Sequence, residues 1–464
     1  MKSLSQSPLL TRANSVSAQI RPDRWVILGL GKTGLSVARF LSAQGEEVVV
    51  FDTRSEPPNL KVLSHELPGI KVHTTNFPED LFRHAKAFVV SPGIALELPV
   101  FESARQAGIP IFGDIELFTR HVTAPYIAIT GSNGKSTVTT LVSKMIEAAG
   151  YSVKAGANLG TPALDLLLPP EPAYYVLELS SFQLECTTGL SAEVACILNI
   201  TADHLDRHKS IDAYVRAKAR ILHNADYVVL NADDPLVVEV GKNLHNVHWI
   251  STNVDTPKNY GVANHGGSRW LTHEGAPLWP ISAIQIKGTH NEFNALAAIA
   301  ITDRIGVPRA VQRAILEQFP GLDHRCRLVA EHNGVRWFND SKGTNIGATV
   351  AAVGGIFSDR AGVLIAGGQG KGADFRGLRT ALINRVHSVV LIGEDAKLIE
   401  AVIDDVVSVA YASDMREAVA LAARAVRSGE SVLLSPACAS LDMFDNYEAR
   451  GYAFEAAVRA MLQT

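Results

Sequence analysis

A glycine-rich stretch, IAITGSNGKSTVTTLV, carries the residue types that bind phosphate. Gly131 and Gly134 free the backbone of a turn that follows an apolar run. Lys135 adds a positive charge, and Ser136 and Thr137 add hydroxyls of the kind that ligate Mg²⁺ at the start of a helix. Backbone N–H groups at a helix N-terminus attract anions. The stretch therefore predicts a nucleotide-phosphate loop.

The loop is shorter than the usual P-loop, because the position of the first glycine holds Ile129. The alternative is an ordinary glycine turn before a helix that Ser136 or Thr137 caps. Strand, loop, lysine, hydroxyl and helix follow in the order that phosphate binding requires, and this order favours the first interpretation.

A second glycine motif, WVILGLGKTGLSVARFL, places Gly29, Gly31 and Gly34 in the pattern G-x-G-x-x-G after a predicted strand. Asp52 ends the next strand 18 residues later. By itself this motif indicates NAD binding, with Asp52 on a ribose hydroxyl. The same turn suits any nucleotide diphosphate, because the helix N-terminus responds to the pyrophosphate.

The apolar run in YYVLELSSFQLE ends at Glu178, so a carboxylate is expected at the carboxyl end of a strand near the phosphate loop. Mg²⁺ prefers oxygen ligands beside phosphates, and Glu178 with Ser136 or Thr137 could supply them. The alternative is a glutamate on the surface at the end of a strand.

Charged residues cluster after another apolar run in ILNITADHLDRHKS, which holds Asp203, His204, Asp206, Arg207 and His208. The two histidines are four residues apart and could form a zinc pair, but the glutamate of H-E-x-x-H is missing. Zinc is therefore the weaker interpretation.

Lys218 lies on the helix predicted after this cluster, between Arg216 and Arg220. Composition alone describes such a segment as a solvated basic face. Spacing gives no reason to reject that description.

Several later motifs place polar residues at helix starts or in glycine turns after strands, where open α/β sheets build sites. In GTHNEFNALAAIA, Asn291 and Asn294 follow His290 and could contact an adenine edge or merely cap the helix. The turns after strands add His324, Arg325, Asp340, Lys342, Thr344, Lys371, Ser440 and Tyr447.

Composition places the chain among ordinary globular proteins, since 47% of its 464 residues are hydrophobic and 19% are charged. Lys and Arg total 43 against 47 Asp and Glu, so the basic excess typical of nucleic-acid or membrane-surface binding is absent. The four scattered cysteines indicate reduced thiols. We expect no membrane span and a flexible leader over residues 1–23.

Apolar, β-branched runs alternate with helical patterns, which predicts an α/β fold with parallel sheets covered by helices. We expect three domains, at 24–113, 114–321 and 322–464. The segment between Asn246 and Pro280 is more typical of β-hairpins added to the middle sheet.

With TGSNGKST, LELSSFQLE, NITADHLDRH, GTHNEFNA, DHRC, NDSKGTN, GGQGKGADF and LSPACASLD in order, the chain resembles the Mur ligases of peptidoglycan synthesis from Trp25 onward. NDSKGTN and SPACASLDMF favour the branch that adds D-glutamate to UDP-N-acetylmuramoyl-L-alanine. No D-N-P-R motif of the diaminopimelate-adding relatives is present. The resemblance implies a Rossmann-like first domain, a P-loop-type ATPase middle domain with a parallel sheet, and a Rossmann-like third domain.

The resemblance also implies which residues contact each substrate. The first domain would bind UDP, not NAD, so no hydride would move. The UDP-substrate residues would be Gly29 to Ser36, including Gly31, Lys32, Thr33 and Gly34, with Asp52, Thr53, Arg54, Ser91, Gly93, Asn158 and His204. ATP would contact Gly131, Ser132, Asn133, Gly134, Lys135, Ser136, Thr137, Asn291, Asn294, Arg325 and Asp340. D-glutamate would contact Lys342, Thr344, Lys371, Ser440, Leu441 and Tyr447, the last standing where phenylalanine is expected.

Two Mg²⁺ ions are implied, one between Ser136, Glu178 and ATP, and one at His204 and a carbamate on Lys218. The implied catalytic residues are Lys135, Glu178, His204, Lys218 and Arg325. The reaction would pass through an acyl phosphate that the D-glutamate amine attacks, in a cytoplasmic monomer. The alternatives are an NAD-dependent dehydrogenase, a folylpolyglutamate synthase-like ligase and a non-catalytic UDP-sugar binder.

Overall fold

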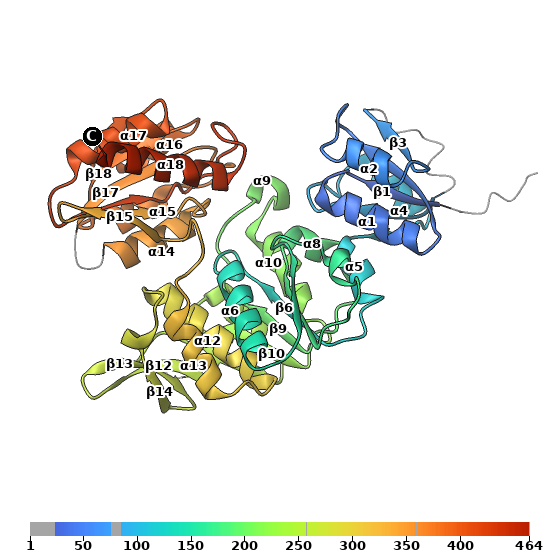
Figure 1. The fold of residues 1–464 in the computed structure, drawn as a ribbon, viewed down its shortest axis with the longest axis horizontal. Helices are drawn as coiled ribbons and strands as arrows, with labels where there is room; N and C mark the ends of the chain where they lie inside the picture. Colours follow the sequence, from blue (N-terminus) through green and yellow to red (C-terminus); the bar gives the residue numbers. More distant parts are fainter. Residues whose placement is uncertain (1–23, 76–84, 257, 358–360, 464) are drawn as a thin grey trace, which may run out of the picture. The chain divides into compact units, whose positions relative to one another are not determined.

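The computed structural model describes residues 24–75, 85–256, 258–357 and 361–463 (Figure 1). The chain divides into two compact units, Met1–Asp114 and Ile115–Thr464. The predicted leader lies outside the described residues. Across the parts that the structure describes, no helix has the length and apolar character needed to cross a membrane.

The first unit is a parallel sheet of five strands in the order β3-β2-β1-β4-β5. Its strands are β1 (Arg24–Leu28), β2 (Glu47–Asp52), β3 (Lys71–Thr74), β4 (Ala85–Val90) and β5 (Ile111–Phe112), and its helices are α1 (Lys32–Ala43), α2 (Leu60–Glu66) and α4 (Pro99–Gln106). The strand order reverses at β1, whose neighbours are β2 and β4. The glycine motif after β1 therefore lies at the switch point, where such sheets bind ligands.

The second unit begins with a nine-stranded sheet in the order β14-β13-β12-β11-β10-β9-β6-β8-β7. Its strands are β6 (Tyr126–Thr130), β7 (Val153–Ala157), β8 (Tyr174–Glu178), β9 (Val194–Ile197), β10 (Tyr227–Asn231), β11 (Val247–Ile250), β12 (Tyr260–His265), β13 (Ser268–His273) and β14 (Ala276–Pro280). The α-helices are α5 (Asp114–Thr119), α6 (Lys135–Ala148), α7 (Ala163–Leu166), α8 (Ser181–Glu185), α9 (Leu205–His208), α10 (Ile211–Ala219), α11 (Pro235–Gly241), α12 (Thr289–Arg304) and α13 (Arg309–Gln318), with 3₁₀ turns η1 (Arg220–Leu222) and η2 (Ile281–Ala283).

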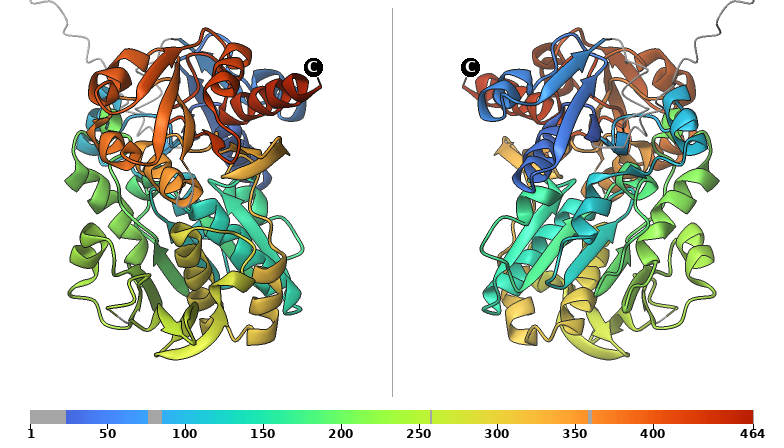
Figure 2. Two further views of the ribbon diagram at one scale, coloured as in Figure 1. Left: turned by 90° about the vertical axis from the view of Figure 1, so that its left-hand side faces the viewer. Right: turned by 90° about the vertical axis from the view of Figure 1, so that its right-hand side faces the viewer.

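Strands β6 to β11 pair in parallel, whereas β12, β13 and β14 form antiparallel hairpins at one edge (Figures 1 and 2). The predicted hairpins between Asn246 and Pro280 are confirmed, apart from β11, which is a parallel strand within that segment.

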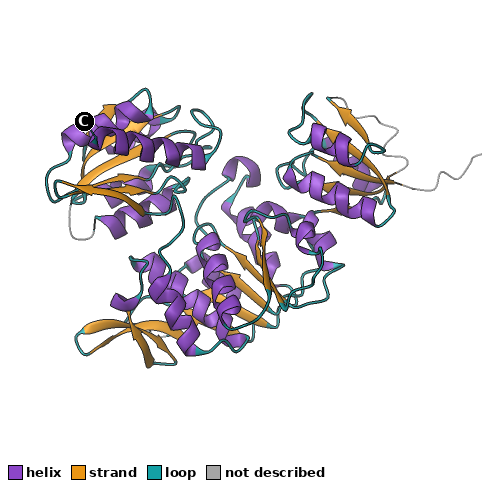
Figure 3. Cartoon of the chain, in the orientation of Figure 1, coloured by secondary structure: helices purple, strands orange, loops and turns teal. Residues whose placement is uncertain are grey.

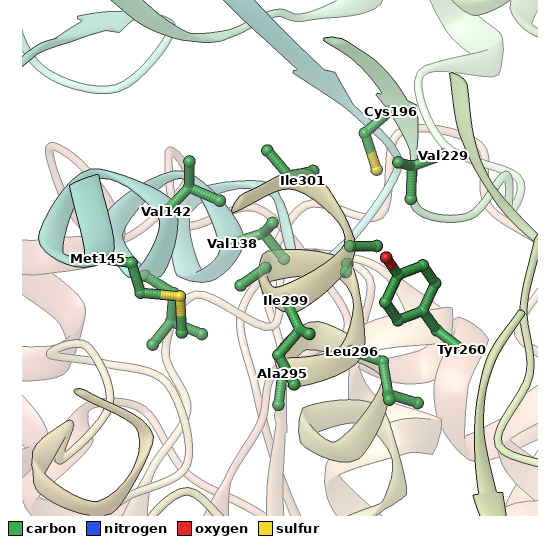
Figure 4. Close-up of a cluster of buried hydrophobic side chains, with 14 of the residues drawn as sticks. Val138, Val142, Met145, Cys196, Val229, Tyr260, Ala295, Leu296, Ile299 and Ile301 are labelled. Atoms are coloured by element: carbon green, nitrogen blue, oxygen red, sulfur yellow. The ribbon is translucent and has the colours of Figure 1, made fainter. Parts of the chain in front are cut away.

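Helix α12 is buried on nearly every side from Glu292 to Thr302. It packs against α6, and Leu296, Ile299 and Ile301 share one core with Val138 and Met145 (Figure 4). A helix that is apolar all round must lie inside a protein. This packing holds α6 and α12 against each other.

A second sheet in this unit has the order β15-β16-β20-β17-β18-β19 and is parallel except for its edge strand β15. Its strands are β15 (Arg327–His332), β16 (Val335–Asn339), β17 (Gly362–Gly367), β18 (Val386–Ile392), β19 (Ser408–Tyr411) and β20 (Ser431–Leu434). Its helices are α14 (Ile346–Ile356), α15 (Arg376–Leu382), α16 (Ala396–Ile403), α17 (Met415–Ala425) and α18 (Tyr447–Leu462). Alternate residues of β17 enter two different cores, so both faces of the sheet are covered (Figure 3). The predicted α/β class is confirmed.

Candidate active site

The phosphate loop joins β6 to α6, and its conformation depends on glycine. Gly134 precedes the helix with a φ of 84°, and a Cβ there would lie 2.6 Å from Asn294 Oδ1. No side chain caps the helix, so the alternative in which Ser136 or Thr137 caps it is wrong. Both hydroxyl residues are buried inside the first turn. The N-terminal N–H groups of α6 are therefore available to an anion.

Asn199 holds the loop in shape from the end of the neighbouring strand β9. Its Oδ1 accepts from Asn133 N at 2.8 Å, and its Nδ2 donates to Asn133 O at 3.0 Å. Ser132 Oγ donates to Thr201 O at 3.0 Å. We did not predict these supports, although Asn199 lies in the NITADHLDRH motif, directly after an apolar run.

Lys135 lies at the first position of α6, partly buried, with its ammonium turned back over the loop. It donates to Gly131 O at 2.8 Å and to Ser132 O at 3.0 Å. Burial lowers its pKa, and the Glu178 carboxylate opposes that shift. The arrangement places a cation where phosphate oxygens could replace the loop carbonyls as partners.

Glu178 ends β8 directly beside Ile129 of β6, and its side chain is only 3% exposed. The alternative of a surface glutamate is therefore wrong. Its Oε1 accepts from Asn158 Nδ2, whereas Oε2 has no hydrogen-bond partner among the described residues. A buried carboxylate oxygen without a partner is costly, and a cation would satisfy it. The donor set thus fits a hard metal ion beside the phosphate loop.

Lys218 is only 1% exposed, so its description as part of a solvated basic face is wrong. Its ammonium donates to Gly131 O at 2.8 Å and lies 4.6 Å from the centre of the Tyr214 ring. Burial lowers the pKa of Lys218 well below its usual value, and Lys135 lowers it further. Composition could not show that this one position of a basic helix faces the phosphate loop.

His204 and His208 contact the same ring, Phe182, at centroid distances of 4.9 and 5.3 Å. His208 is buried, with Nε2 2.9 Å from Ser181 Oγ. Within the described ranges, no group of three or more His, Cys, Asp or Glu side chains could hold a metal ion. The zinc alternative gains no support. Burial lowers the pKa of His204, against the opposing effect of Asp203.

A cavity of about 760 Å³ extends from the phosphate loop toward the second sheet of the unit. Asn291 and Asn294 line it from the start of α12 and are joined by a hydrogen bond of 3.1 Å. The other predicted site residues that line it are Asn133, Gly134, Thr137, Arg325, Asp340 and Lys342. The volume suits a drug-sized or nucleotide-sized ligand.

Arg325 and Asp340 lie at the same cavity. Arg325 Nη2 donates to Ser136 Oγ at 3.0 Å. Asp340 accepts from Cys326 N at 3.2 Å and from Ser435 Oγ at 2.6 Å. Burial raises the pKa of Asp340 to about 6. Arg325 thus approaches the phosphate loop, whereas Asp340 is held by Cys326 and Ser435, which lie near it in the second sheet region.

The residues expected to bind D-glutamate lie on three segments that contact one another. The Lys342 ammonium sits 3.6 Å from the centre of the Tyr447 ring, and a bridge between Gln369 and Ala439 joins the loops of Lys371 and Ser440. Burial lowers the pKa of Lys342 to about 8. Thr344 N donates to Lys342 O at 2.8 Å. Leu441 is 67% exposed.

Arg450 ties these loops together and was not predicted. It is buried and donates to Ser341 Oγ at 3.0 Å, to Cys438 O at 3.1 Å and to Ala439 O at 3.2 Å. An arginine in a helical pattern gives no sequence signal that it points inward.

In the first unit, the predicted UDP residues surround the turn between β1 and α1. Gly31 precedes α1, which contains Lys32, Thr33, Gly34 and Ser36. A Cβ at Gly34 would lie 1.9 Å from Gly29 O, and Ser91 Oγ donates to the same carbonyl at 3.1 Å. The backbone here is too close for any side chain, as expected where a helix start approaches a strand.

Asp52 is buried and fully engaged within the first unit. Its Oδ2 accepts from Leu30 N at 2.7 Å, and Arg54 donates to both of its oxygens. The Arg54 guanidinium lowers the pKa of Asp52 to about 2. Thr53 and Gly93 lie in the adjoining loops, whereas Asn158 and His204 belong to the second unit.

Fold and site together define an α/β protein with a lysine, an arginine and a buried carboxylate at one glycine loop, which are the residue types that bind nucleotide phosphates. Comparison with known families gives three matches: "Mur ligase MurD-like, N-terminal domain" over residues 23–113, "Mur ligase middle domain" over 129–302, and "Mur ligase, glutamate ligase domain" over 324–438. The chain belongs to the Mur ligase family.

Curated relatives similar to this chain are named UDP-N-acetylmuramoylalanine--D-glutamate ligase. The protein of Nitrosococcus oceani is 49% identical over 437 residues, which cover 94% of this chain and 96% of the relative. That of Legionella pneumophila (strain Lens) is 48% identical over 443 residues, which cover 94% of this chain and 99% of the relative. That of Pseudomonas syringae pv. syringae is 46% identical and covers 95% and 98%.

Solved structures share the fold at low identity. A pseudomurein peptide ligase type C from Methanothermus fervidus matches with a TM-score of 0.61 at 16% identity, covering 94% of this chain and 100% of that one. The UDP-N-acetylmuramate-alanine ligase MurC from Thermotoga maritima matches with a TM-score of 0.59 at 18% identity, covering 95% and 99%.

Proposed function

We propose that the chain is an ATP-dependent ligase that joins D-glutamate to UDP-N-acetylmuramoyl-L-alanine and forms ADP and phosphate. The observation that carries this proposal is the set of relatives with that ligase name, 44–49% identical over at least 94% of this chain. The phosphate loop with Lys135, Glu178 and Arg325 supplies what such a reaction needs.

The proposed reaction brings several negatively charged groups together in the site. An oxygen of the alanyl carboxylate attacks the γ-phosphorus of ATP, ADP leaves, and an acyl phosphate results. The D-glutamate amine then attacks the acyl carbon, phosphate leaves with the carboxylate oxygen, and the amine gives up a proton as the amide forms. Both steps bring anions together. Lys135 and Arg325 therefore act by offsetting negative charge in the transition state.

For ATP, we place the phosphates on residues 131–137, the adenine beside Asn291 and Asn294, and the ribose beside Asp340. The cavity joins these groups. Asn294 Nδ2 donates to Asn291 Oδ1 at 3.1 Å and Asn291 Nδ2 donates to Lys287 O at 2.8 Å, which leaves Asn294 Oδ1 as an acceptor for the amine of a base.

We place one Mg²⁺ at Ser136 and Glu178, because Glu178 Oε2 is buried without a described partner. When bound, this ion would neutralise phosphate charge. A second ion would need an oxygen ligand near His204. Lys218 could supply it as a carbamate, formed when its neutral amine bonds to the carbon of CO₂ and releases a proton. The lowered pKa of Lys218 favours the neutral amine that this addition requires.

For the remaining substrates, we place D-glutamate between the loops of Lys342, Thr344, Lys371, Ser440, Leu441 and Tyr447, with the two lysines facing its carboxylates. We place the UDP group at Gly31–Gly34, Asp52, Thr53, Arg54, Ser91 and Gly93, with Asn158 and His204 toward the muramoyl end. The corresponding domains would be 24–113, 114–321 and 322–464. Because one chain carries every group used, we propose a monomer, and we propose the cytoplasmic location that the resemblance to peptidoglycan-precursor ligases implies.

The alternatives have less support. A dehydrogenase or a UDP-sugar binder has no use for the second nucleotide loop with its buried carboxylate. A folylpolyglutamate synthase-like ligase would not explain the match of residues 23–113 to a MurD-like N-terminal domain.

Release of phosphate in a coupled assay tests the proposal. Turnover should require ATP, UDP-N-acetylmuramoyl-L-alanine and D-glutamate together. Equal turnover with L-glutamate, or a stoichiometric change in NADH, would overturn it.

A further inference from the structure

Asn345 is the last residue of NDSKGTN and directly follows Thr344, yet the proposed reaction assigns it no role. Its side chain is 7% exposed and caps helix α14, since Oδ1 accepts from Ala348 N at 2.9 Å. Asparagine is a preferred helix cap, so this contact alone would explain the residue.

The amide end of the same side chain makes two further contacts across the unit. Asn345 Nδ2 donates to Asp203 Oδ2 at 3.0 Å and to Asn133 Oδ1 at 3.2 Å, and Asn133 Nδ2 donates back to Asn345 Oδ1 at 3.3 Å. These partners lie 142 and 212 residues away in sequence. A helix cap requires neither of them.

Both partners belong to parts of the site with assigned chemistry. Asn133 lies in the phosphate loop, where Asn199 fixes its backbone. Asp203 precedes His204, accepts from its backbone N–H at 2.9 Å and lies 3.7 Å from its Nε2. Asn345 thus connects the phosphate loop, and the loop of Asp203 and His204 (the histidine loop), to the segment of Lys342 and Thr344.

The start of α14 also packs closely on the histidine loop. A Cβ at Gly347 would lie 3.0 Å from Thr201 Oγ1. A small shift of either loop would therefore move the other, because close-packed segments cannot deform independently.

We propose that Asn345 is a positioning residue that couples nucleotide binding at the phosphate loop to binding of the incoming amino acid. This inference rests on the proposed function. Bound ATP would hold the side chain of Asn133 in place. Asn133 and Asp203 then hold the side chain of Asn345, which in turn holds the backbone that carries Thr344 and Lys342. By linkage, D-glutamate must in turn strengthen nucleotide binding by the same factor.

Mutation can remove the Nδ2 donor and keep the oxygen, which caps α14 and also accepts from Asn133 Nδ2. Asn345→Asp and Asn345→Ser keep an oxygen that caps α14 but remove the Nδ2 donor, and Asp also sets a carboxylate against Asp203. The matched control is Asn446→Asp. Asn446 caps α18 in the same way, accepting from Ala449 N at 2.7 Å, and it too adjoins a residue of the proposed amino-acid site.

The experiment measures the Kd of D-glutamate by calorimetry with UDP-N-acetylmuramoyl-L-alanine present, with and without a non-hydrolysable ATP analogue. We expect the analogue to tighten D-glutamate binding to wild type by about tenfold, within the usual range of coupling, and to change it less than about twofold in both Asn345 variants. The KM for D-glutamate should rise in these variants but not in Asn446→Asp, which changes a helix cap alone.

Wild-type coupling retained in Asn345→Asp and Asn345→Ser would overturn the coupling role, and so would the absence of coupling in wild type. Asn345→Asp combined with Asp203→Asn should regain part of the coupling, because the donor and acceptor are exchanged. If wild type ligates D-glutamate and any of these expectations fails, only the coupling role falls. If wild type does not ligate D-glutamate, the proposed function falls with it.

Discussion

Arg325 donates through Nη2 to Ser136 Oγ at 3.0 Å, although 189 residues separate them in sequence. This contact brings a guanidinium from the turn before β15 to the first turn of the phosphate-loop helix. A cation that reaches the phosphate loop from another segment can stabilise charge that develops during phosphoryl transfer.

Arg325→Ala should lower kcat by about 10²- to 10³-fold, the usual effect of removing a group that stabilises transition-state charge. Steady-state phosphate release measures this loss. Arg313→Ala is the control, because the ion-pair partner of Arg313 among the described residues is Glu317, on the surface of α13. Similar rates for the two variants would contradict the role of Arg325.

Glu178→Gln should separate activity from stability. The substitution removes a buried charge whose Oε2 has no described partner, but it also removes the attraction between Glu178 and Lys135, so the free energy of unfolding should change by no more than about 1–3 kcal/mol. Turnover should fall by more than about 100-fold, since the metal loses its anionic ligand. Urea unfolding and phosphate release measure the two quantities. A variant that is both less stable and active would refute this account.

Lys218→Ala should lose most of its turnover, and high concentrations of acetate or formate should restore part of it by filling the position of the carbamate. Lys218→Arg should not be rescued, because guanidinium brings the wrong charge to a metal. Arg216→Ala, on the exposed face of the same helix, is the control. Near-normal turnover of Lys218→Ala would rule out the carbamate.

Binding of D-glutamate should weaken at alkaline pH because the pKa of Lys342 is lowered to about 8. Only the ammonium attracts a carboxylate, so deprotonation above this pKa should lower kcat/KM for D-glutamate by about tenfold per pH unit. The ratio of wild type to Lys342→Arg cancels titration of the substrate amine and should fall from pH 8 to 9.5. A flat ratio would show that Lys342 does not bind the amino acid.

The fold was predictable from sequence because the apolar runs of the parallel strands are continuous and their glycine turns are distinctive. WVILGL, YIAITG and GVLIAGG each became a buried strand before a site-bearing turn. The hairpins β12 to β14 were predictable because glycines also mark the turns between these strands.

The burial of polar residues was not predictable in the same way. Lys218 and Arg450 sit in helical patterns that resemble solvated faces, and only tertiary packing turns them inward. Asn199, Arg450 and Asn345 act by holding loops that are distant in sequence. Such contacts leave no periodic signal.

In the proposed reaction, the site activates a carboxylate by transferring the γ-phosphoryl group of ATP to it. UDP-N-acetylmuramoyl-L-alanine labelled with ¹⁸O in both alanyl carboxylate oxygens tests this claim directly, with D-glutamate and unlabelled ATP in ordinary water. Mass spectrometry should find one ¹⁸O atom in each phosphate released and one in the new amide of the product. Ligation that leaves the released phosphate unlabelled would contradict the claim.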